Sequence, residues 1–107
     1  MTAFAGSRLT STQRKYLRGL AHALEPLVHV GRGGVNEGVL SATRRALEDH
    51  ELIKVKIGAD RETRARMANE IERACDADLA GAVGTIAILY RQNPDPQKRR
   101  IELPQKP

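Results

Sequence analysis

One run of small and basic residues in this sequence could do chemistry. Gly31, Arg32, Gly33 and Gly34 follow a short β-prone stretch and stand just before Asn36, a residue type that caps helix N-termini. Glycine lets the backbone approach a ligand closely, and free amide groups at a helix start attract anions. The guanidinium of Arg32 adds a planar set of donors that suits phosphate. The residue types in this run therefore favour a phosphate group as ligand.

The spacing of the glycines narrows which phosphate could bind. A nucleotide-binding phosphate loop needs a Gly-x-x-x-x-Gly-Lys run followed by Ser or Thr, which the sequence lacks. A dinucleotide site beginning at Gly31 needs a glycine at position 36, where the chain has Asn36. The remaining spacing, Gly-x-x-Gly, clamps nucleic-acid backbone in KH-type domains. A strand-to-helix connection that binds no ligand is the other interpretation, and these four residues alone do not decide between the two.

Basic residues gather toward the two ends of the 107-residue chain, whose formal net charge is +5. Residues 8–18 hold four basic side chains and no acidic one, and residues 91–107 hold five basic and two acidic ones. The stretch 19–90 is nearly balanced, with nine basic and eleven acidic residues. Clustered cations release counterions when they meet phosphates, so this distribution favours a polyanion as partner, and a basic protein whose charge serves only solubility is the alternative. The residues expected to join the glycine run in one positive surface are Arg14, Lys15, Arg18, Lys54, Lys56, Lys98, Arg99 and Arg100.

Aromatic residues are scarce. The chain has two tyrosines, one phenylalanine and no tryptophan, so it lacks a platform on which several bases could stack. Tyr16 falls on the apolar side of the first expected helix and is predicted to lie in the core. These features favour contacts to the backbone of folded RNA over stacking of splayed single strands.

Catalytic and metal-binding patterns are missing from the sequence. It contains no Cys-x-x-Cys, His-Glu-x-x-His or comparable spacing, and Cys75 stands in an apolar setting typical of a core residue. Glu48, Asp49 and Glu51 cluster together with arginines at helical spacing from them, so solvated ion pairs account for these acids. We expect no enzymatic activity, no metal, no cofactor and no small-molecule substrate.

The length and the single cysteine bound the setting of the chain. One domain fits 107 residues, and one cysteine cannot form an intramolecular disulfide, which favours the reducing cytoplasm. Residues 1–7 lack the pattern of a secretory signal, and no apolar run approaches the roughly 20 residues that cross a bilayer. A cytoplasmic monomer without a membrane contact is the expectation.

Two elements precede the glycine run. Thr10 and Gln13 have the spacing of a capping box, which predicts a helix from Ser11 that ends before Pro26. Leu17, Leu20 and Leu24 are among the residues that recur on its apolar side. Residues 27–30 form a β-prone stretch after that proline, with His29 facing away from the better-packed side.

The rest of the chain alternates between helices and strands. Asn36 predicts the cap of a second helix and Asp60 the cap of a third, which reaches about Cys75. Residues 52–57 alternate strictly, which predicts a half-buried strand with Lys54 and Lys56 facing out. Residues 78–83 and 85–91 are expected to form a hairpin, and a proline-containing tail that cannot add to a core follows. The order α-β-α-β-α-β-β predicts an α/β fold with one layer of about four strands, three helices and some parallel pairing.

Several longer runs together resemble one known family. They are Leu17–His22, Val30–Val39, His50–Lys56 and Leu89–Arg91, and they look like the CRM domain (chloroplast RNA splicing and ribosome maturation), in particular its stand-alone bacterial YhbY type. The similarity extends from about Leu9 to Leu103. It divides the chain into an N-terminal segment of residues 1–8 that is expected to be flexible, a domain of residues 9–91 and a basic tail of residues 92–107.

The resemblance carries expectations of its own. It implies a mixed four-stranded sheet with three helices, similar to the C-terminal domain of bacterial translation initiation factor three. It also implies RNA binding through the loop of residues 31–34 and association with ribosomal RNA in precursors of the large ribosomal subunit. A module that contacts proteins of such an assembly, without touching RNA, remains the alternative.

Overall fold

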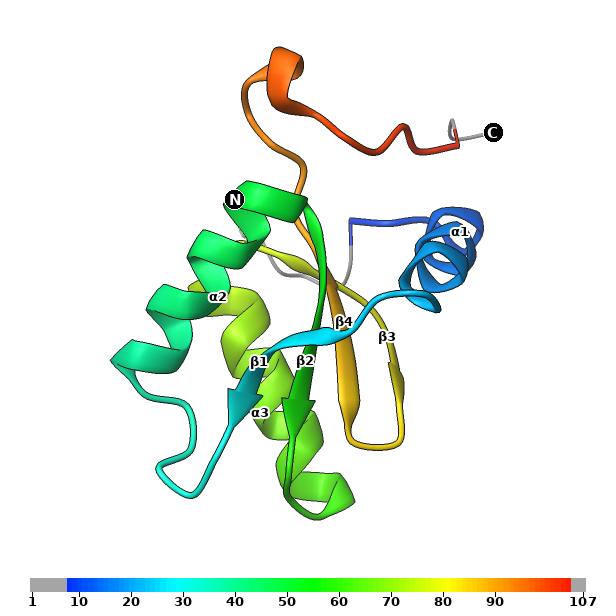
Figure 1. Cartoon of the computed structure of the whole chain (residues 1–107). Coiled ribbons are helices and arrows are strands. Elements are labelled where there is room, and N and C mark those ends of the chain that lie inside the picture. Colours follow the sequence, from blue (N-terminus) through cyan, green and yellow to red (C-terminus); the bar gives the residue numbers. More distant parts are fainter. Residues whose placement is uncertain (1–7, 105–107) are drawn as a thin grey trace.

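The computed structural model describes residues 8–104 and confirms the expected order of elements (Figure 1). Residues 1–7, which make up most of the expected flexible segment, and Lys106 of the basic tail lie outside the described residues. The elements are α1 (Ser11–Ala21), β1 (Pro26–Val30), α2 (Glu37–His50), β2 (Leu52–Ile57), α3 (Arg61–Ala74), β3 (Asp78–Val83), β4 (Ile86–Tyr90) and a short 3-10 helix (Pro96–Lys98).

The four strands form one mixed sheet in the order β1-β2-β4-β3. β1 and β2 are parallel and are joined by the crossover helix α2, while β4 runs antiparallel to β2 and to β3. This pairing confirms the mixed α/β sheet with three helices. In its register His29 lies beside Lys56, and Lys54 lies beside Ile88.

Helices cover both faces of the sheet, which the sequence did not predict. α2 and α3 pack on one face, where the inward residues of β2, namely Ile53, Val55 and Ile57, form the main core. α1 packs on the other face through Leu17 and Ala21, in a second apolar cluster that also holds Leu52, Ile88 and Tyr90. α1 covers only part of its face, so Lys56 on the same face of β2 remains exposed.

The three predicted helix caps are confirmed. Thr10 and Gln13 form a reciprocal capping box, because the Thr10 hydroxyl accepts the Gln13 amide at 3.1 Å and the Gln13 side chain accepts the Thr10 amide at 3.0 Å. Asn36 Oδ1 accepts the Val39 amide and Asp60 Oδ1 accepts the Thr63 amide, each at 2.9 Å. Each cap satisfies backbone donors that a helix start otherwise leaves without partners.

The first helix was expected to include Leu24, and both this extent and its expected apolar face were wrong. α1 ends at Ala21, and Pro26 opens β1 instead of terminating the helix. The helix meets the sheet through a narrow stripe, with Leu17 and Ala21 buried and Gln13 reaching the Pro104 carbonyl at 2.9 Å. Tyr16 lies beside this stripe and is 41% exposed, so it is not a core residue.

The tail does add to the core, contrary to the sequence prediction. Ile101 and Leu103 pack against the cluster beneath α1, and Asn93 is buried. The carboxylate of Glu51 is also buried and accepts backbone amides of this tail, so it is not one of the solvated ion-pair acids that the sequence indicated. A polar contact over more than forty positions leaves no local sequence pattern.

The core position predicted for Cys75 is confirmed. Its side chain is buried, and its Sγ lies 3.8 Å from the Leu40 carbonyl oxygen. Burial raises the pKa of the Cys75 thiol, which keeps the sulfur protonated and a poor nucleophile.

Candidate nucleic-acid interface

The glycine run forms an exposed turn between the end of β1 and the start of α2. The amide of Gly34 donates to the carbonyl of Gly31 at 3.0 Å, which closes the turn. Gly31, Arg32 and Gly33 are all exposed within it. Arg32 makes no hydrogen bond or ion pair with any residue in 8–104, so its guanidinium is available to a ligand.

The two glycines of the Gly-x-x-Gly spacing have different reasons to be glycine. Gly34 has a φ of +68°, in the left-handed region where side chains are disfavoured. Gly31 has no positive φ, and a Cβ added to it would meet no atom within 4 Å. The fold therefore accounts for Gly34 and leaves the glycine at position 31 without a structural reason.

The first turns of α3 lie against this turn. A Cβ placed on Gly34 would come 3.7 Å from Cε of Met67, which is on α3. The β1 residue before the turn, Val30, pairs with Ile57, and Asp60 begins the cap of α3 three residues later. The glycine turn and the N-terminal end of α3 therefore share one end of the sheet (Figure 1).

A row of basic side chains leads away from the turn along the sheet face that α1 partly covers. Lys56 pairs with His29 next to the turn, and both side chains are exposed. Lys54 lies further along the same face, and its Nζ donates to the Leu24 carbonyl at 3.0 Å. Arg18 of α1 continues the row, since its Nη1 donates to the Ala80 carbonyl at 3.3 Å.

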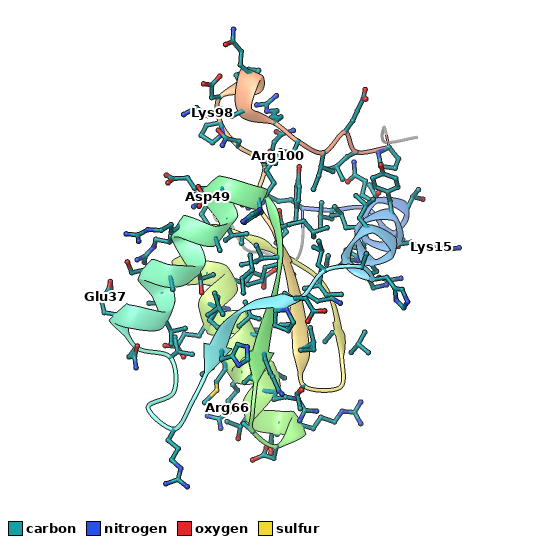
Figure 2. All side chains as sticks on the ribbon, viewed as in Figure 1. Lys15, Glu37, Asp49, Arg66, Lys98 and Arg100 are labelled. Carbon is teal, nitrogen blue, oxygen red and sulfur yellow. The ribbon has the colours of Figure 1, made fainter. Side chains whose placement is uncertain are left out.

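The remaining predicted residues are not on this surface, so the expectation of one continuous positive surface was wrong. Lys98 shares a surface hollow with Asp49 near the C-terminal end of α2, whereas the glycine turn precedes the N-terminal end. A helix of 14 residues is about 21 Å long, which separates the two sites. Figure 2 shows Lys98 and Arg100 at the end of the molecule opposite the turn.

Arg14 and Lys15 also lie apart from the glycine turn. The Arg14 guanidinium donates to the Leu9 carbonyl at 2.8 Å, at the start of α1. Lys15 points away from the body of the domain (Figure 2). Arg99 is occupied in the tail, where its Nε donates to the Asn93 carbonyl at 2.8 Å. The physical reason for the correction is that α1 directs Arg14 and Lys15 away from the β1–α2 connection, while the tail holds Arg99 near the C-terminal end of α2.

Comparison with known proteins adds the family to this geometry. The model of the CRS1 / YhbY (CRM) domain matches residues 9–91, which span all three helices and all four strands. The chain belongs to the CRM domain family. The resemblance read from the sequence is thereby confirmed.

Relatives of this CRM domain carry names that refer to RNA. An RNA-binding protein of Haemophilus influenzae is 44% identical over 99 residues, covering 92% of this chain and 97% of its own length. A probable RNA-binding protein of Pseudomonas aeruginosa is 42% identical and covers 84% of this chain and 88% of its own. These relatives are named for binding RNA and not for catalysis.

A solved structure shares the fold of this CRM domain. It is the solution structure of a Staphylococcus aureus protein with a TM-score of 0.77 and 32% sequence identity, covering 90% of this chain and 99% of that one. The mixed sheet with helices on both faces is thus an arrangement that a related sequence also adopts.

The sequence reasoning missed two basic residues of this CRM domain. Arg61 and Arg64 extend from the first turns of α3, at the same end of the sheet as the glycine turn, and neither forms an ion pair with a described carboxylate. The sequence interpretation assigned Arg61 and Arg64 no role. The signal that could have found them is the position of Arg61 directly after the Asp60 cap, where a helix start already favours anions.

Residues 8–104 lack two kinds of feature. No cluster of three or more His, Cys, Asp or Glu side chains there has the arrangement of a metal site. None of the helices in this range combines the length and the apolar character that crossing a bilayer requires.

Proposed function

We propose that this CRM domain binds structured RNA through the sugar-phosphate backbone. The turn of residues 31–34 and the amides at the start of α2 hold one phosphate, and the Arg32 guanidinium pairs with it or with its neighbour. Arg18, Lys54 and Lys56 continue the contact along the open face of the sheet. The names of the relatives support RNA as the partner.

The observation that carries the proposal is the exposed pair of Gly31 and Arg32. Gly31 is a glycine that the fold does not require, and Arg32 is a cation that no described residue neutralises. A side chain at position 31 would stand between a ligand and the backbone. The positive charge of Arg32 can pair with a phosphate. The fold requires neither feature, and both are useful to an RNA-binding surface.

Backbone recognition fits the placement of the aromatic residues. Tyr90 is buried beneath α1, and Tyr16 lies on α1. Neither tyrosine is on the glycine turn, so within residues 8–104 no tyrosine can stack a base there. Folded RNA presents phosphates at fixed spacing, which a turn and a row of cations can match without reading the sequence.

We further propose that the RNA is ribosomal and belongs to precursors of the large subunit, which agrees with the ribosome maturation in the family's name. We also propose that the chain acts as a cytoplasmic monomer. Residues 9–91 would form the binding unit. Lys98, Arg99, Arg100 and the two basic residues at the start of α1, Arg14 and Lys15, would contact separate parts of a large RNA. A large folded RNA can reach more than one end of a domain whose longest dimension is 39 Å.

The salt dependence of binding tests the proposal against the protein-contact alternative. Affinity for a fragment of large-subunit ribosomal RNA should fall steeply with salt, by about 0.7–0.9 in the log-log slope for each phosphate neutralised. Arg32→Glu should weaken binding about tenfold or more, because it removes a charge-assisted contact and adds repulsion. Arg73→Glu is the matched control, since Arg73 is exposed at the far end of α3. A flat salt response, or equal affinity of Arg32→Glu and wild type, contradicts the proposal.

A further inference from the structure

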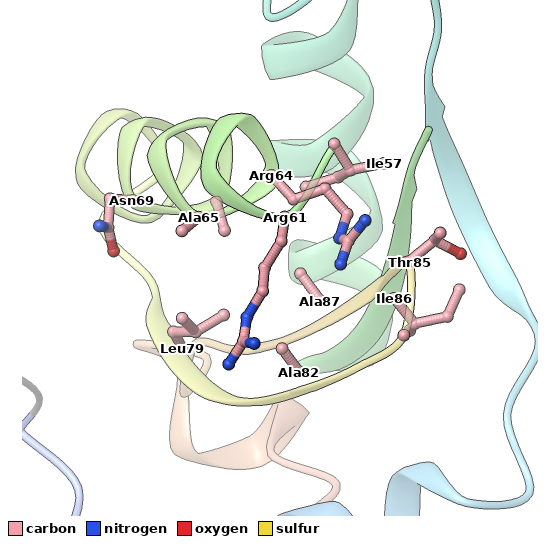
Figure 3. A pocket seen from close by; sticks show the side chains of 12 residues that line it. Ile57, Arg61, Arg64, Ala65, Asn69, Leu79, Ala82, Thr85, Ile86 and Ala87 are labelled. Carbon is pink, nitrogen blue, oxygen red and sulfur yellow. The ribbon is translucent and has the colours of Figure 1, made fainter. Parts of the chain in front are cut away.

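A hollow lies between α3 and the β3–β4 hairpin, apart from the sheet face that carries Lys54 and Lys56. It is a hollow of about 510 Å³ at the end of the sheet, bordered by α3 on one side and by the hairpin on the other (Figure 3). Its volume falls within the roughly 300–1,000 Å³ that is typical of small-ligand sites. Such a hollow can enclose one small flat group but not a helix or a strand.

The hollow exists because small side chains face each other across it. Ala65 and Ala68 line it from α3, and Ala82 and Ala87 line it from the hairpin. Leu79 adds an apolar wall and Asn69 places an amide at the border. An apolar lining with few polar groups is what binds a flat, largely apolar group and orients it through one edge.

Two arginines give this apolar hollow a positive charge. Arg61 and Arg64 both line it, and Figure 3 shows the guanidinium of Arg61 directed toward the hairpin. Nη1 of Arg64 donates to the Ala59 carbonyl at 2.6 Å, which holds that side chain in place. Arg61 makes no hydrogen bond or ion pair with a residue in 8–104, so its donors are available.

The combination selects the class of ligand. A guanidinium binds phosphate through paired donors and also stacks on a planar ring, and arginine planes stack RNA bases where aromatic side chains are missing. Apolar walls of alanine and leucine suit the face of a base. A nucleotide joins these two features in one unit, with a flat ring and an adjacent phosphate.

We propose that this hollow binds a single unstacked nucleotide, with its base between the alanines and its phosphate at Arg61. The occupant is a nucleotide of the RNA strand held at the glycine turn, so the inference rests on the proposed function. The two sites flank the same helix: Met67 of α3 faces Gly34, and Ala65 and Ala68 face the hollow. A strand that leaves the turn therefore reaches the hollow across the start of α3.

Two variants of the full chain isolate the hollow. Ala82→Leu fills it from an exposed position of the hairpin, so the fold should tolerate the change, and Arg61→Ala removes the free guanidinium. Arg73→Ala is the charge-matched control on the same helix. Urea denaturation of each variant shows whether the fold is retained.

The first measurement titrates each protein with adenosine, guanosine, cytidine and uridine 5′-monophosphates and follows amide resonances by NMR. The matching nucleosides and inorganic phosphate serve as controls for the two halves of the ligand. The second measurement crosslinks wild type and variants to a large-subunit ribosomal RNA fragment by ultraviolet light and maps the crosslinked peptides. The first measurement detects a free nucleotide and the second a nucleotide within RNA.

In wild type we expect a crosslink in the peptides that contain Arg61–Asn69 or Ala82–Ala87, and we expect Ala82→Leu to lose it. RNA affinity should fall about threefold to tenfold in Arg61→Ala and stay unchanged in Arg73→Ala. Resonance shifts at the same residues with monophosphates, but without a crosslink, assign the hollow to a free nucleotide instead. A third outcome is that wild type binds RNA, that Ala82→Leu and Arg61→Ala match its affinity and crosslinks, and that no monophosphate shifts these resonances. The hollow is then not a nucleotide site, although the proposed function stands. If wild type binds no RNA, the proposed function fails, and the monophosphate titration decides the hollow by itself.

Discussion

Oε2 of Glu51 accepts the backbone amide of Asn93 at 2.6 Å, although 42 positions separate the two residues. The other carboxylate oxygen, Oε1, accepts the amides of Arg100 at 2.7 Å and Ile101 at 3.0 Å. Glu51 is 0% exposed, so one buried carboxylate at the end of α2 holds the C-terminal tail at two places, Asn93 and Arg100–Ile101. This anchor fixes Lys98 and Arg100 at the end of the molecule opposite the glycine turn.

Replacing Glu51 with Gln should destabilise the fold. A glutamine side chain offers one acceptor oxygen where the carboxylate offers two. Its NH₂ group would face backbone N–H groups that now donate hydrogen bonds to the carboxylate. Buried donors left without partners cost about 1–3 kcal/mol each, so we expect the free energy of unfolding in urea to fall by about 2–4 kcal/mol. Glu48→Gln is the control, because Glu48 is exposed on the same turn of α2. Equal denaturation midpoints for the two variants would show that the carboxylate does not hold the tail.

Tyr90 should make the fold sensitive to alkaline pH. Burial, with a smaller contribution from the negative charge of Glu51, raises the pKa of Tyr90 from 10.0 to about 12. The folded state therefore holds the phenol proton more tightly than the unfolded state does. The resulting stability is fully present below pH 10 and is lost as the pH rises from about 10 to about 12.

The Tyr90→Phe variant measures this contribution. The Tyr90 hydroxyl is buried and has no hydrogen-bond partner within residues 8–104, so its removal should leave stability at pH 7 unchanged or raise it by up to about 1 kcal/mol. Urea denaturation of wild type should show an extra loss on the order of 1–3 kcal/mol between pH 10 and 12 that Tyr90→Phe lacks. Tyr16→Phe, at an exposed position, should behave like wild type. Parallel pH profiles of wild type and Tyr90→Phe would contradict the prediction.

Local signals in the sequence were sufficient for the elements and the turn. The capping residues Thr10, Asn36 and Asp60 begin helices where expected, and the strict alternation of residues 52–57 gives β2 with Lys56 outward. Each of these features depends on neighbours within four positions, where side-chain type and backbone geometry are directly coupled. The glycine turn was readable for the same reason.

Features set by distant contacts were not readable. The tail docks because Glu51 is buried beneath it, and no periodic pattern records a carboxylate that meets amides 42 to 50 positions away. Tyr16 is exposed because α1 meets the sheet along a stripe narrower than its apolar face. Charge along the chain likewise does not say which end of a sheet a lysine reaches, so the basic tail was grouped with the turn.

The separation of the basic residues predicts unequal effects of equal charge changes. Lys56→Ala and Lys98→Ala each remove one exposed lysine, but Lys56 lies beside the glycine turn and Lys98 at the opposite end. For an RNA hairpin short enough to cover only one end, Lys56→Ala should lower affinity about threefold and reduce the salt slope by about 1, while Lys98→Ala leaves both near wild type. Binding curves at several salt concentrations measure both quantities. Equal losses in the two variants would place the RNA contact elsewhere or over the whole surface.

The two glycines of the turn should respond to alanine in opposite ways. Gly34 has a φ of +68°, so Gly34→Ala should lower the free energy of unfolding by about 1–2 kcal/mol. At Gly31 the added Cβ meets no atom within 4 Å and the backbone has no positive φ, so Gly31→Ala should leave stability unchanged or raise it by about 0.4–1 kcal/mol. If a phosphate approaches the backbone at Gly31, the same Cβ lies in its path, and RNA affinity should fall severalfold in a variant that is at least as stable as wild type.

Gly19→Ala is the control, because it also adds a Cβ in open space but lies on α1 away from the turn. Urea denaturation and RNA binding by fluorescence anisotropy separate the two effects, and full RNA affinity in both Gly31→Ala and the bulkier Gly31→Val would mean that no ligand needs this backbone.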